Sequence, residues 1–380
     1  MSINYVSIKQ VSTNTVPAHH ATQPSANTAA AHPSSGAATH LWYRPLTGNE
    51  LRQCLRIAFG CTTGFLLCKL FGWGYGVFYT VTPVLLLGMV PVMNGHAARQ
   101  LIASAVVCGV EVGLLGGLFG SYPALMTPIA FLLFLYRFAA MSRGSLFLFG
   151  ANGVLSLSIM LHFASYPQTD LNDLIFNNIW ANILSVLIAY LMTALIPDLE
   201  ARPKPAPAAK APHRMRHEAL LGATVATLSF LTFQLFDLRD SMSAQATTLL
   251  VLFPMHWNGA LSYARKRAMG TLLGVTFGLL GQLLLYDWSG QLLLVAPLLW
   301  LGAMLFSHAH VKEAGGSGVG FGALTTLGIL FGQYLTPGND LVFSALYRVS
   351  SILFAIVVTL LACYLIHRLL NRFEATRFGY

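Results

Sequence analysis

Long apolar segments separated by short polar ones run through residues 50–370 of the chain. Each apolar segment extends over roughly 17–25 residues with few charges, which is the length that a helix needs to cross about 30 Å of hydrocarbon. Twelve transmembrane helices are predicted, at about 52–70, 75–93, 100–119, 122–140, 145–163, 174–196, 218–236, 242–256, 268–286, 291–307, 318–334 and 342–369. The pattern therefore predicts an all-α integral membrane protein.

The two halves of this pattern resemble each other. Residues 68–87 align with residues 233–252, and the Asn-Gly pair of "PVMNGHAAR" aligns with that of "PMHWNGALSYAR". Each half holds six predicted helices, and an even number gives both halves the same orientation in the membrane. We therefore expect two parallel six-helix repeats related by an axis along the membrane normal, as in some transporters.

Segments of different composition flank and join the two repeats. Residues 1–45 are rich in Ser, Thr, Ala, Pro and His, which predicts a disordered cytoplasmic tail and not a signal peptide. The repeats are expected over residues 50–197 and 218–370. Residues 198–217 are predicted as a basic, Pro- and Ala-rich cytoplasmic linker between them, and residues 371–380 as a cytoplasmic tail.

The distribution of charge predicts the orientation. Only 9% of the residues are charged and 55% are hydrophobic, against about 25% charged in soluble proteins. Basic residues gather in the loops of one side: Arg44, Arg52, Arg56, Arg99, Arg137, Arg143, Arg202, Lys204, Lys210, Arg214, Arg216, Arg265, Lys266, Arg267, Lys312, Arg368, Arg372 and Arg377. The other side carries Asp170, Asp173, Asp237, Asp240, Asp287 and Asp340, with Lys69, Arg239 and Arg348 as exceptions. The positive-inside rule then places both termini in the cytoplasm, so the net charge of +9 does not indicate nucleic acid binding.

Signatures of soluble enzymes are missing from the sequence. It contains no phosphate-binding loop, no HExxH, no CxxC and no GxSxG. The five cysteines lie in apolar segments and read as small apolar residues, while the pair His308 and His310 is a weak metal signal. The sequence thus predicts no metal site, no cofactor and no enzymatic activity.

Glu111 is the one carboxylate in "ASAVVCGVEVGLLGGLFG", residues 103–120. A charge at this depth costs about 2.5–3.5 kcal/mol on insertion scales, so it should face a cavity or a partner. Such a residue is a candidate for carrying a proton. The alternative is a neutral glutamic acid that only ties helices together.

Other polar residues in or beside the predicted helices are candidates for a substrate path. Arg348 could bind the carboxylate of Glu111 or of an anionic substrate, or it could extend to the lipid headgroups. Asn178 and Asn182 lie at a similar depth in the other half. Asn94, His256 and Asn258 mark the ends of two predicted helices, where they line a substrate entrance or form ordinary turns. Arg56 and Arg137, near helix ends, are expected to extend to the headgroups.

Small residues recur at four-residue spacing in the third and ninth predicted helices. Glycine at this spacing makes a flat stripe on which two helices approach closely. The expected packing glycines are Gly109, Gly113, Gly117, Gly270, Gly274 and Gly278.

One segment carries a family resemblance. "YARKRAMGTLLGVTFG", residues 263–278, has the pattern R-x-R-x-x-G-T-x-x-G-x-x-x-G. It resembles the second and third helices of the fusaric-acid-resistance/aromatic-acid-exporter superfamily, and "LRIAFGCTTGFLLCKLFGWGYGVFYTVTPVLL" is similar to the opening pair of helices in that family. The first half keeps Arg99 but has Ile102 and Ala103 in place of Gly-Thr.

The resemblance implies a function as well as a fold. It implies a proton-driven efflux permease of the bacterial inner membrane that exports aromatic carboxylic acids or similar amphiphilic compounds. Its partners would be a small organic anion or drug-like substrate, a periplasmic membrane-fusion adaptor and an outer-membrane channel. The chain looks like a short form without the large cytoplasmic domain, and the resemblance transfers no catalytic residue. A homo-oligomer stays open.

Two other functions are compatible with the sequence. A non-transporting scaffold that assembles a partner complex would tolerate Glu111→Gln and Arg348→Lys. A membrane-embedded transferase would need acids and histidines gathered at one face, where the sequence offers scattered aspartates and His162.

Overall fold

The computed structural model describes residues 45–119, 122–166, 169–202, 210–236, 242–288, 290–313, 318–334 and 341–378. All of them belong to one compact unit, Arg44–Tyr380. The predicted disordered tail, residues 1–45, falls almost wholly outside the described residues, as does the middle of the predicted linker. Over the described ranges the chain forms helices and turns and no strand.

Twelve α-helices and two short 3₁₀ helices make up the described part of the chain. The first half contains α2 (Gly48–Phe71), α3 (Gly76–Met89), α4 (Gly95–Phe119), α5 (Pro123–Ser142), α6 (Phe147–Ala164) and α7 (Leu171–Leu195). The second half contains α8 (Pro212–Leu235), α9 (Met242–Val251), α10 (Trp257–Leu284), η2 (Tyr286–Trp288), α11 (Leu292–Lys312), α12 (Val319–Tyr334), α13 (Leu341–Leu370) and η3 (Glu374–Thr376). Each predicted segment corresponds to one α-helix.

Helix length confirms a multi-pass membrane protein. Nine of the described helices are long and apolar enough to cross a membrane. The other three helices are shorter than the segments predicted for them. The helix α3 has 14 residues, α9 has 10 and α12 has 16. A ten-residue helix rises about 15 Å, which is half of the hydrocarbon thickness of about 30 Å.

The chain remains apolar beyond the ends of these short helices, which is why the sequence overestimates them. After α9 the backbone turns through Pro254, which has no N–H to donate, and Met255, whose φ of 61° is left-handed. The helix α3 contains Pro83 and ends at Met89, before a second proline, Pro91. The apolar composition of these segments therefore predicts that they are buried, but it does not predict where the helix ends.

Two other helices begin earlier than predicted. The helix α8 starts at Pro212, inside the predicted linker, with proline in the first turn where its missing N–H costs nothing. The helix α10 starts at Trp257, capped by His256, whose Nδ1 accepts from the Gly259 N–H at 3.0 Å. Arg267 was predicted to lie in the loop before this helix, and this is wrong, since it lies within α10.

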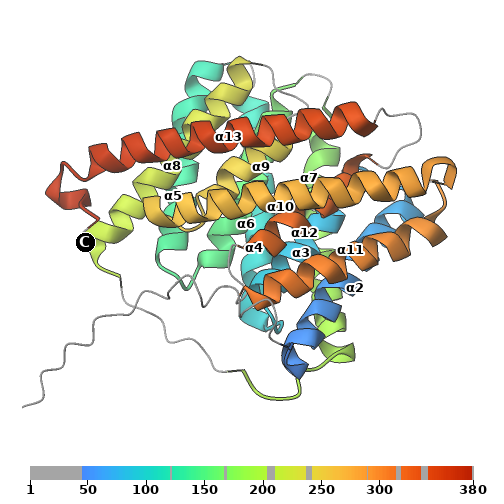
Figure 1. The fold of residues 1–380 in the computed structure, drawn as a ribbon. Coiled ribbons are helices and arrows are strands. Elements are labelled where there is room, and N and C mark those ends of the chain that lie inside the picture. The colour runs from blue at the N-terminus through green and yellow to red at the C-terminus, as the bar shows by residue number, and fades with distance from the viewer. Residues whose placement is uncertain are drawn as a thin grey trace, which may run out of the picture. The chain divides into compact units, whose positions relative to one another are not determined.

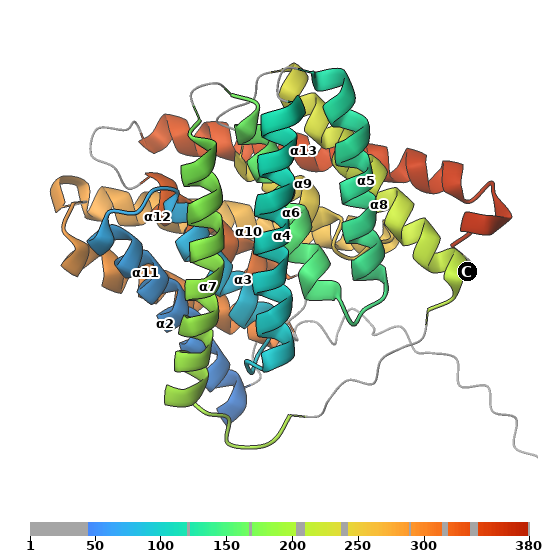
Figure 2. The same ribbon diagram turned by 180° about the vertical axis from the view of Figure 1, so that it is seen from behind.

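The helices run in two crossing directions. Figure 2 shows α4, α5 and α7 upright, in front of α10 and α13, which run across the view. Figure 1 shows α10 and α13 from the other side. The halves meet where α5 packs on α8, α11 on α2, α3 on α12 and α6 on α9. Within the halves, α4 packs on α6 and α7, and α10 packs on α12 and α13.

The glycine stripe of α10 lies against α12. A Cβ atom on Gly274 would stand 2.8 Å from the Ala323 carbonyl oxygen, and one on Gly278 would stand 2.8 Å from the side chain of Leu330. Gly270 also faces the backbone of α12. In the first half the stripe is less regular, because Gly109 and Gly113 face α7 whereas a Cβ on Gly117 would meet nothing within 4 Å.

Gly64 brings α2 into backbone contact with α3, and replacing it is expected to destabilise the fold. A Cβ there would collide with the carbonyl oxygen of Tyr79 and approach Pro83. Overpacking of this kind costs about 1–3 kcal/mol, so Gly64→Ala should lower the melting temperature of the purified protein. Gly117→Ala, also in a helix but facing open space, should leave it unchanged or raise it. Equal melting temperatures for the two variants would contradict the close approach of α2 to α3.

Candidate functional site

The short helices α3 and α9 occupy corresponding places, since each is the second helix of its half. In transporters with internal repeats, unusually short or Pro-interrupted helices at corresponding positions point to the binding site. The helix α3 contains Pro83, and α9 has 10 residues. A binding site is therefore expected between these two helices.

A cavity of about 50 Å³ lies between them, with walls from α3, α6, α7, α9 and α12. We call it the central cavity. Its polar lining residues are Thr82, Asn152, Ser156, Asn178 and Thr325, and the remaining wall is apolar. Ligand pockets commonly measure about 300–1,000 Å³, so the cavity is narrow and would have to widen around an organic molecule.

Side-chain amides connect α6 and α7 along one wall of the central cavity. The Asn152 amide donates to Asn182 Oδ1 at 3.1 Å, and Asn182 Nδ2 donates to the Asn178 carbonyl at 2.7 Å. Asn178 Nδ2 donates to Ser156 Oγ at 3.3 Å, but its Oδ1, although buried, accepts no hydrogen bond from the described residues. Such an acceptor is costly to leave unsatisfied, and it suits a ligand that donates an O–H.

Arg267 is a fully buried cation behind the opposite wall of the central cavity. Its guanidinium donates to Thr325 Oγ1, to the Gly322 carbonyl at 3.1 Å and to Thr247 Oγ1 at 3.3 Å. Thr325 itself lines the cavity. Among the described residues no carboxylate forms an ion pair with Arg267. Because a buried charge without a counter-charge is costly, this arginine favours the approach of an anion.

Glu111 forms an ion pair with Arg137, at 2.6 Å between Oε2 and Nη2. The arginine reaches from α5 to α4 across Gly153 of α6, where a Cβ would stand 2.9 Å from Arg137 Cδ. Its guanidinium also lies 4.7 Å from the centre of the Phe149 ring. Gly153 follows Asn152 of the central cavity, so the ion pair and the cavity contact adjacent faces of α6.

Two expectations about these arginines are wrong. Arg348 was the expected companion of Glu111, whereas the structure pairs Glu111 with Arg137. Arg56 and Arg137 were expected to extend to the headgroups, yet both are fully buried. Counting residues along a helix gives the depth of a side chain but not the face on which it lies.

Arg56 is held at one end of the fold by Asp198, at 2.5 Å. Asp198 also accepts from Arg202 at 2.7 Å. Burial acts to raise the pKa of Asp198, but the hydrogen bonds and charges of Arg202 and Arg56 outweigh it and hold the pKa below its usual value. The cluster fixes the start of α2 to the segment that follows α7, away from the residues that line the central cavity.

Comparison with protein families matches the two halves separately. Residues 53–192 match the model of a protein family of unknown function (DUF2955), and residues 225–362 match the model described as fusaric acid resistance protein-like. The chain carries a fusaric acid resistance protein-like region. The first match begins in α2 and ends in α7, and this region begins in α8 and ends in α13. No curated protein and no solved structure matched the chain.

The fusaric acid resistance protein-like region contains the segment that carried the resemblance in the sequence, residues 263–278. That segment supplies Arg267 behind the central cavity and the glycines that bring α10 against α12. The region also contains Arg348, which is buried and donates to Ser243 Oγ of α9 at 2.8 Å. Arg348 thus joins α13 to α9.

The predicted entrance residues lie apart from the central cavity. His256 is the N-cap of α10 in the fusaric acid resistance protein-like region, and burial together with the charge of Arg214 lowers its pKa. Asn94 Oδ1 accepts from the Ala97 N–H at 2.9 Å, which makes it a cap at the start of α4. Asn258 is exposed in the first turn of α10. Asn178 is the one predicted path residue in the cavity wall, and Asn182 supports it.

Sequence reasoning missed Asn152, Ser156, Thr325 and Arg267 as site residues. Arg267 was visible as part of the arginine and glycine motif of the fusaric acid resistance protein-like region, but it was assigned to a loop. Asn152 and Ser156 lie in a largely apolar helix, "FLFGANGVLSLSIMLHFA", where their spacing of four residues placed them on one face. Thr325 gave no separate signal.

Proposed function

We propose that this protein is an efflux permease that exports an organic anion through the central cavity between its two halves. The observation that carries the proposal is the pair of opposite walls around that cavity. One wall has the buried acceptor Asn178 Oδ1, and the other has Arg267 behind Thr325 without a counter-charge among the described residues. The match of residues 225–362 to the fusaric acid resistance protein-like model supports transport, because that family is a transporter family.

Aromatic carboxylic acids fit this pair of walls. Their carboxylate would be attracted to the Arg267 side, and a ring hydroxyl would donate to Asn178 Oδ1. The remaining lining of Phe78, Leu155, Ile159 and Ile329 offers an apolar surface for a ring. Similar amphiphilic organic compounds share these features.

The proposed transporter consists of two parallel six-helix repeats, α2–α7 and α8–α13. The packing pairs support this division: α4 with α6 and α7 corresponds to α10 with α12 and α13, and α5 on α8 corresponds to α11 on α2. Such reciprocal contacts are expected for two halves related by an axis along the membrane normal. With the basic loops on the inner side, both termini lie in the cytoplasm.

The remaining features of the proposal come from the family resemblance. The protein would act in the bacterial inner membrane, with a periplasmic membrane-fusion adaptor and an outer-membrane channel as partners. Transport would be driven by protons, with Glu111 as the proton-coupling residue. Its ion pair with Arg137 supports this role, because protonation of the carboxylate would release a buried arginine beside α6.

Transport by proteoliposomes with an imposed pH gradient tests the proposal, with a panel of hydroxylated aromatic acids as substrates. Asn178→Ala should reduce the transport rate about tenfold, because one hydrogen bond worth about 1.4 kcal/mol is lost. Asn172→Ala is the matched control, since Asn172 lies on the same helix but is exposed. No transport by the wild-type protein, or an equal rate for Asn178→Ala, would refute a path through the central cavity and favour a scaffold.

A further inference from the structure

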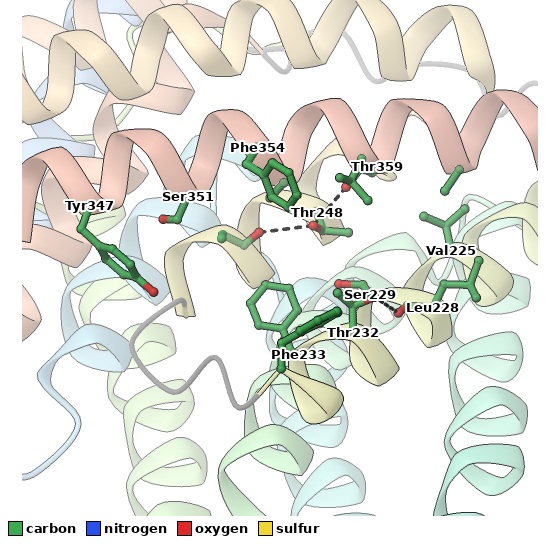
Figure 3. Close-up of a pocket in the computed structure, with 15 residues that line it drawn as sticks. Val225, Leu228, Ser229, Thr232, Phe233, Thr248, Tyr347, Ser351, Phe354 and Thr359 are labelled. Atoms are coloured by element: carbon green, nitrogen blue, oxygen red, sulfur yellow. Dashed lines mark hydrogen bonds between the residues drawn. The ribbon is translucent and has the colours of Figure 1, made fainter.

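A groove of about 620 Å³ runs along the outside of the second half, between α8, α9 and α13. On α13 it extends from Tyr347 to Ala362, a distance of about 22 Å at a helical rise of about 1.5 Å per residue. Figure 3 shows the walls: Phe354 and Thr359 come from α13, and Phe233 and Val225 come from α8. The volume is within the range of about 300–1,000 Å³ that is usual for ligand pockets.

The rim of the groove belongs to the surface that faces the bilayer. Leu228 and Phe236 of α8 and Phe354 and Val358 of α13 are between 42% and 70% exposed. The floor is Ala244 and Thr248 of α9, which are buried. Hydrogen bonds from Thr359 to Thr248, at 3.1 Å, and from Arg348 to Ser243, at 2.8 Å, hold this floor to α13.

No lining residue of the groove is charged. The walls are aromatic and aliphatic, with hydroxyl groups as their polar atoms. The Ser229 hydroxyl is buried and makes no hydrogen bond among the described residues. An occupant that matches this lining is uncharged, apolar along its length and able to hydrogen-bond to a hydroxyl.

The first half packs closely at the corresponding place, and the sequence explains why. When residue 68 is aligned with residue 233, Gly64 aligns with Ser229 and Tyr79 with Ala244. In the first half Gly64 lets α2 touch the Tyr79 carbonyl. In the second half Ser229 and Ala244 both line the groove. Side chains on α8 in place of glycines keep α8 away from α9.

The groove and the central cavity lie on opposite faces of one short helix. Ala244 and Thr248 of α9 face the groove, whereas Ala246 and Leu250 face the central cavity. Residues two apart on a helix lie on nearly opposite sides. A displacement of α9, which has 10 residues, would therefore connect the bilayer to the cavity.

We propose that this groove is a lateral intake site for an aromatic amphiphile dissolved in the bilayer in its uncharged, protonated form. This inference rests on the proposed function, since it supplies the substrate of that export path. The neutral molecule lies among the aromatic side chains, and it passes α9 to meet Asn178 and the Arg267 side of the central cavity.

Photolabelling in lipid nanodiscs tests the groove without requiring transport. The probe is a diazirine derivative of an alkyl-substituted hydroxybenzoic acid, used as the acid and as its uncharged methyl ester, with the full chain. We expect both to label peptides that contain residues 225–236 and 347–362, the ester at least as strongly as the acid at pH 7. Excess unlabelled aromatic ester should compete.

Two variants fill the groove from different sides, Ser229→Phe on α8 and Ala355→Leu on α13, and each should reduce labelling at least tenfold. Val357→Phe is the control, because Val357 is 65% exposed on α13 and does not line the groove. Labelling spread evenly over the bilayer-facing helices, or unchanged in both filled variants, would overturn the proposal. Competition by added phospholipid but not by the aromatic ester would assign the groove to a bilayer lipid and also overturn it. Specific labelling by a protein that transports nothing would leave the groove standing and refute the export function.

Discussion

Arg267→Met is expected to reduce transport strongly while leaving the protein folded. The side chain is fully buried, and its guanidinium donates to Thr325, Thr247 and the Gly322 carbonyl without an ion-pair partner in the described part of the chain. Methionine removes the charge, which is costly to bury, and keeps an apolar side chain of similar length at this position. The loss of a charge-assisted interaction with an anionic substrate, worth about 1.5–3 kcal/mol, should reduce transport by about ten- to a hundredfold.

The groups that Arg267 leaves behind keep other hydrogen bonds, which is why folding should survive. The Gly322 carbonyl also accepts from Thr326 Oγ1 at 2.9 Å, and the Thr325 hydroxyl donates to the Phe321 carbonyl at 3.0 Å. Initial transport rates and melting temperatures should be measured together. Arg265→Met, an exposed position two residues earlier on α10, is the matched control and should behave as wild type.

Arg267→Lys separates charge from hydrogen bonding, because lysine keeps the charge but not the fork of donors. We expect it to retain part of the transport activity. If Arg267→Met unfolds the protein and Arg267→Lys does not, the arginine is a structural donor between α9, α10 and α12, and the anion path loses its main support.

The helices could be predicted from the sequence, because hydrocarbon thickness imposes a length on each apolar segment. Every predicted segment overlaps one α-helix of the structure. The exceptions in length, above all α9, arise where proline and a left-handed residue end a helix inside an apolar run. At these places the bilayer requires only that the segment be apolar. Neighbouring helices cover the apolar residues that lie beyond the end of the short helix.

The candidate site could be predicted only in part. Asn178 was a candidate because a polar amide is costly in an apolar membrane helix and often marks a functional site. In the structure it lies in the cavity wall. Depth along the helix suggested Arg348 as a partner of Glu111 and the headgroups for Arg137, because it does not show which helices are neighbours. The pairing depends on Gly153 of α6, which leaves room for Arg137 to pass from α5 to α4. Such a relation involves three helices and has no local sequence signal.

The groove shows what comparison of the two halves adds. The alignment of residues 68–87 with 233–252 could be made from the sequence. Only the structure shows that a glycine at an aligned position decides how closely the two helices pack. Gly64 closes the first half, and Ser229 at the aligned position leaves the second half open. Corresponding pairs of helices in the two halves therefore pack differently: α2 contacts α3 closely, whereas α8 and α9 border the groove.

Glu111→Gln is expected to eliminate transport driven by a pH gradient, with at least a hundredfold loss of the gradient-dependent rate. The carboxylate is the partner of Arg137, and the glutamine cannot take up and release a proton. The substitution also leaves a fully buried arginine without its counter-charge, and breaking a buried pair in this way costs about 3–5 kcal/mol. The single variant alone cannot separate coupling from stability, so the double variant Glu111→Gln/Arg137→Met is the decisive protein. It removes both charges, which should restore the melting temperature to near that of the wild type.

Transport by the double variant should be measured in everted vesicles in two ways, with an imposed pH gradient and as downhill exchange of substrate without one. If Glu111 couples proton movement to α6, the double variant will exchange substrate across the membrane but will not accumulate it when a gradient is applied. The reason lies in the arrangement of α6, which carries Asn152 and Ser156 toward the central cavity and Gly153 toward Arg137. A titrating partner for Arg137 would make the position of this helix depend on pH. Accumulation at the wild-type rate by a stable double variant would instead assign the ion pair a purely structural role and place the coupling proton on another group, including one carried by the substrate itself.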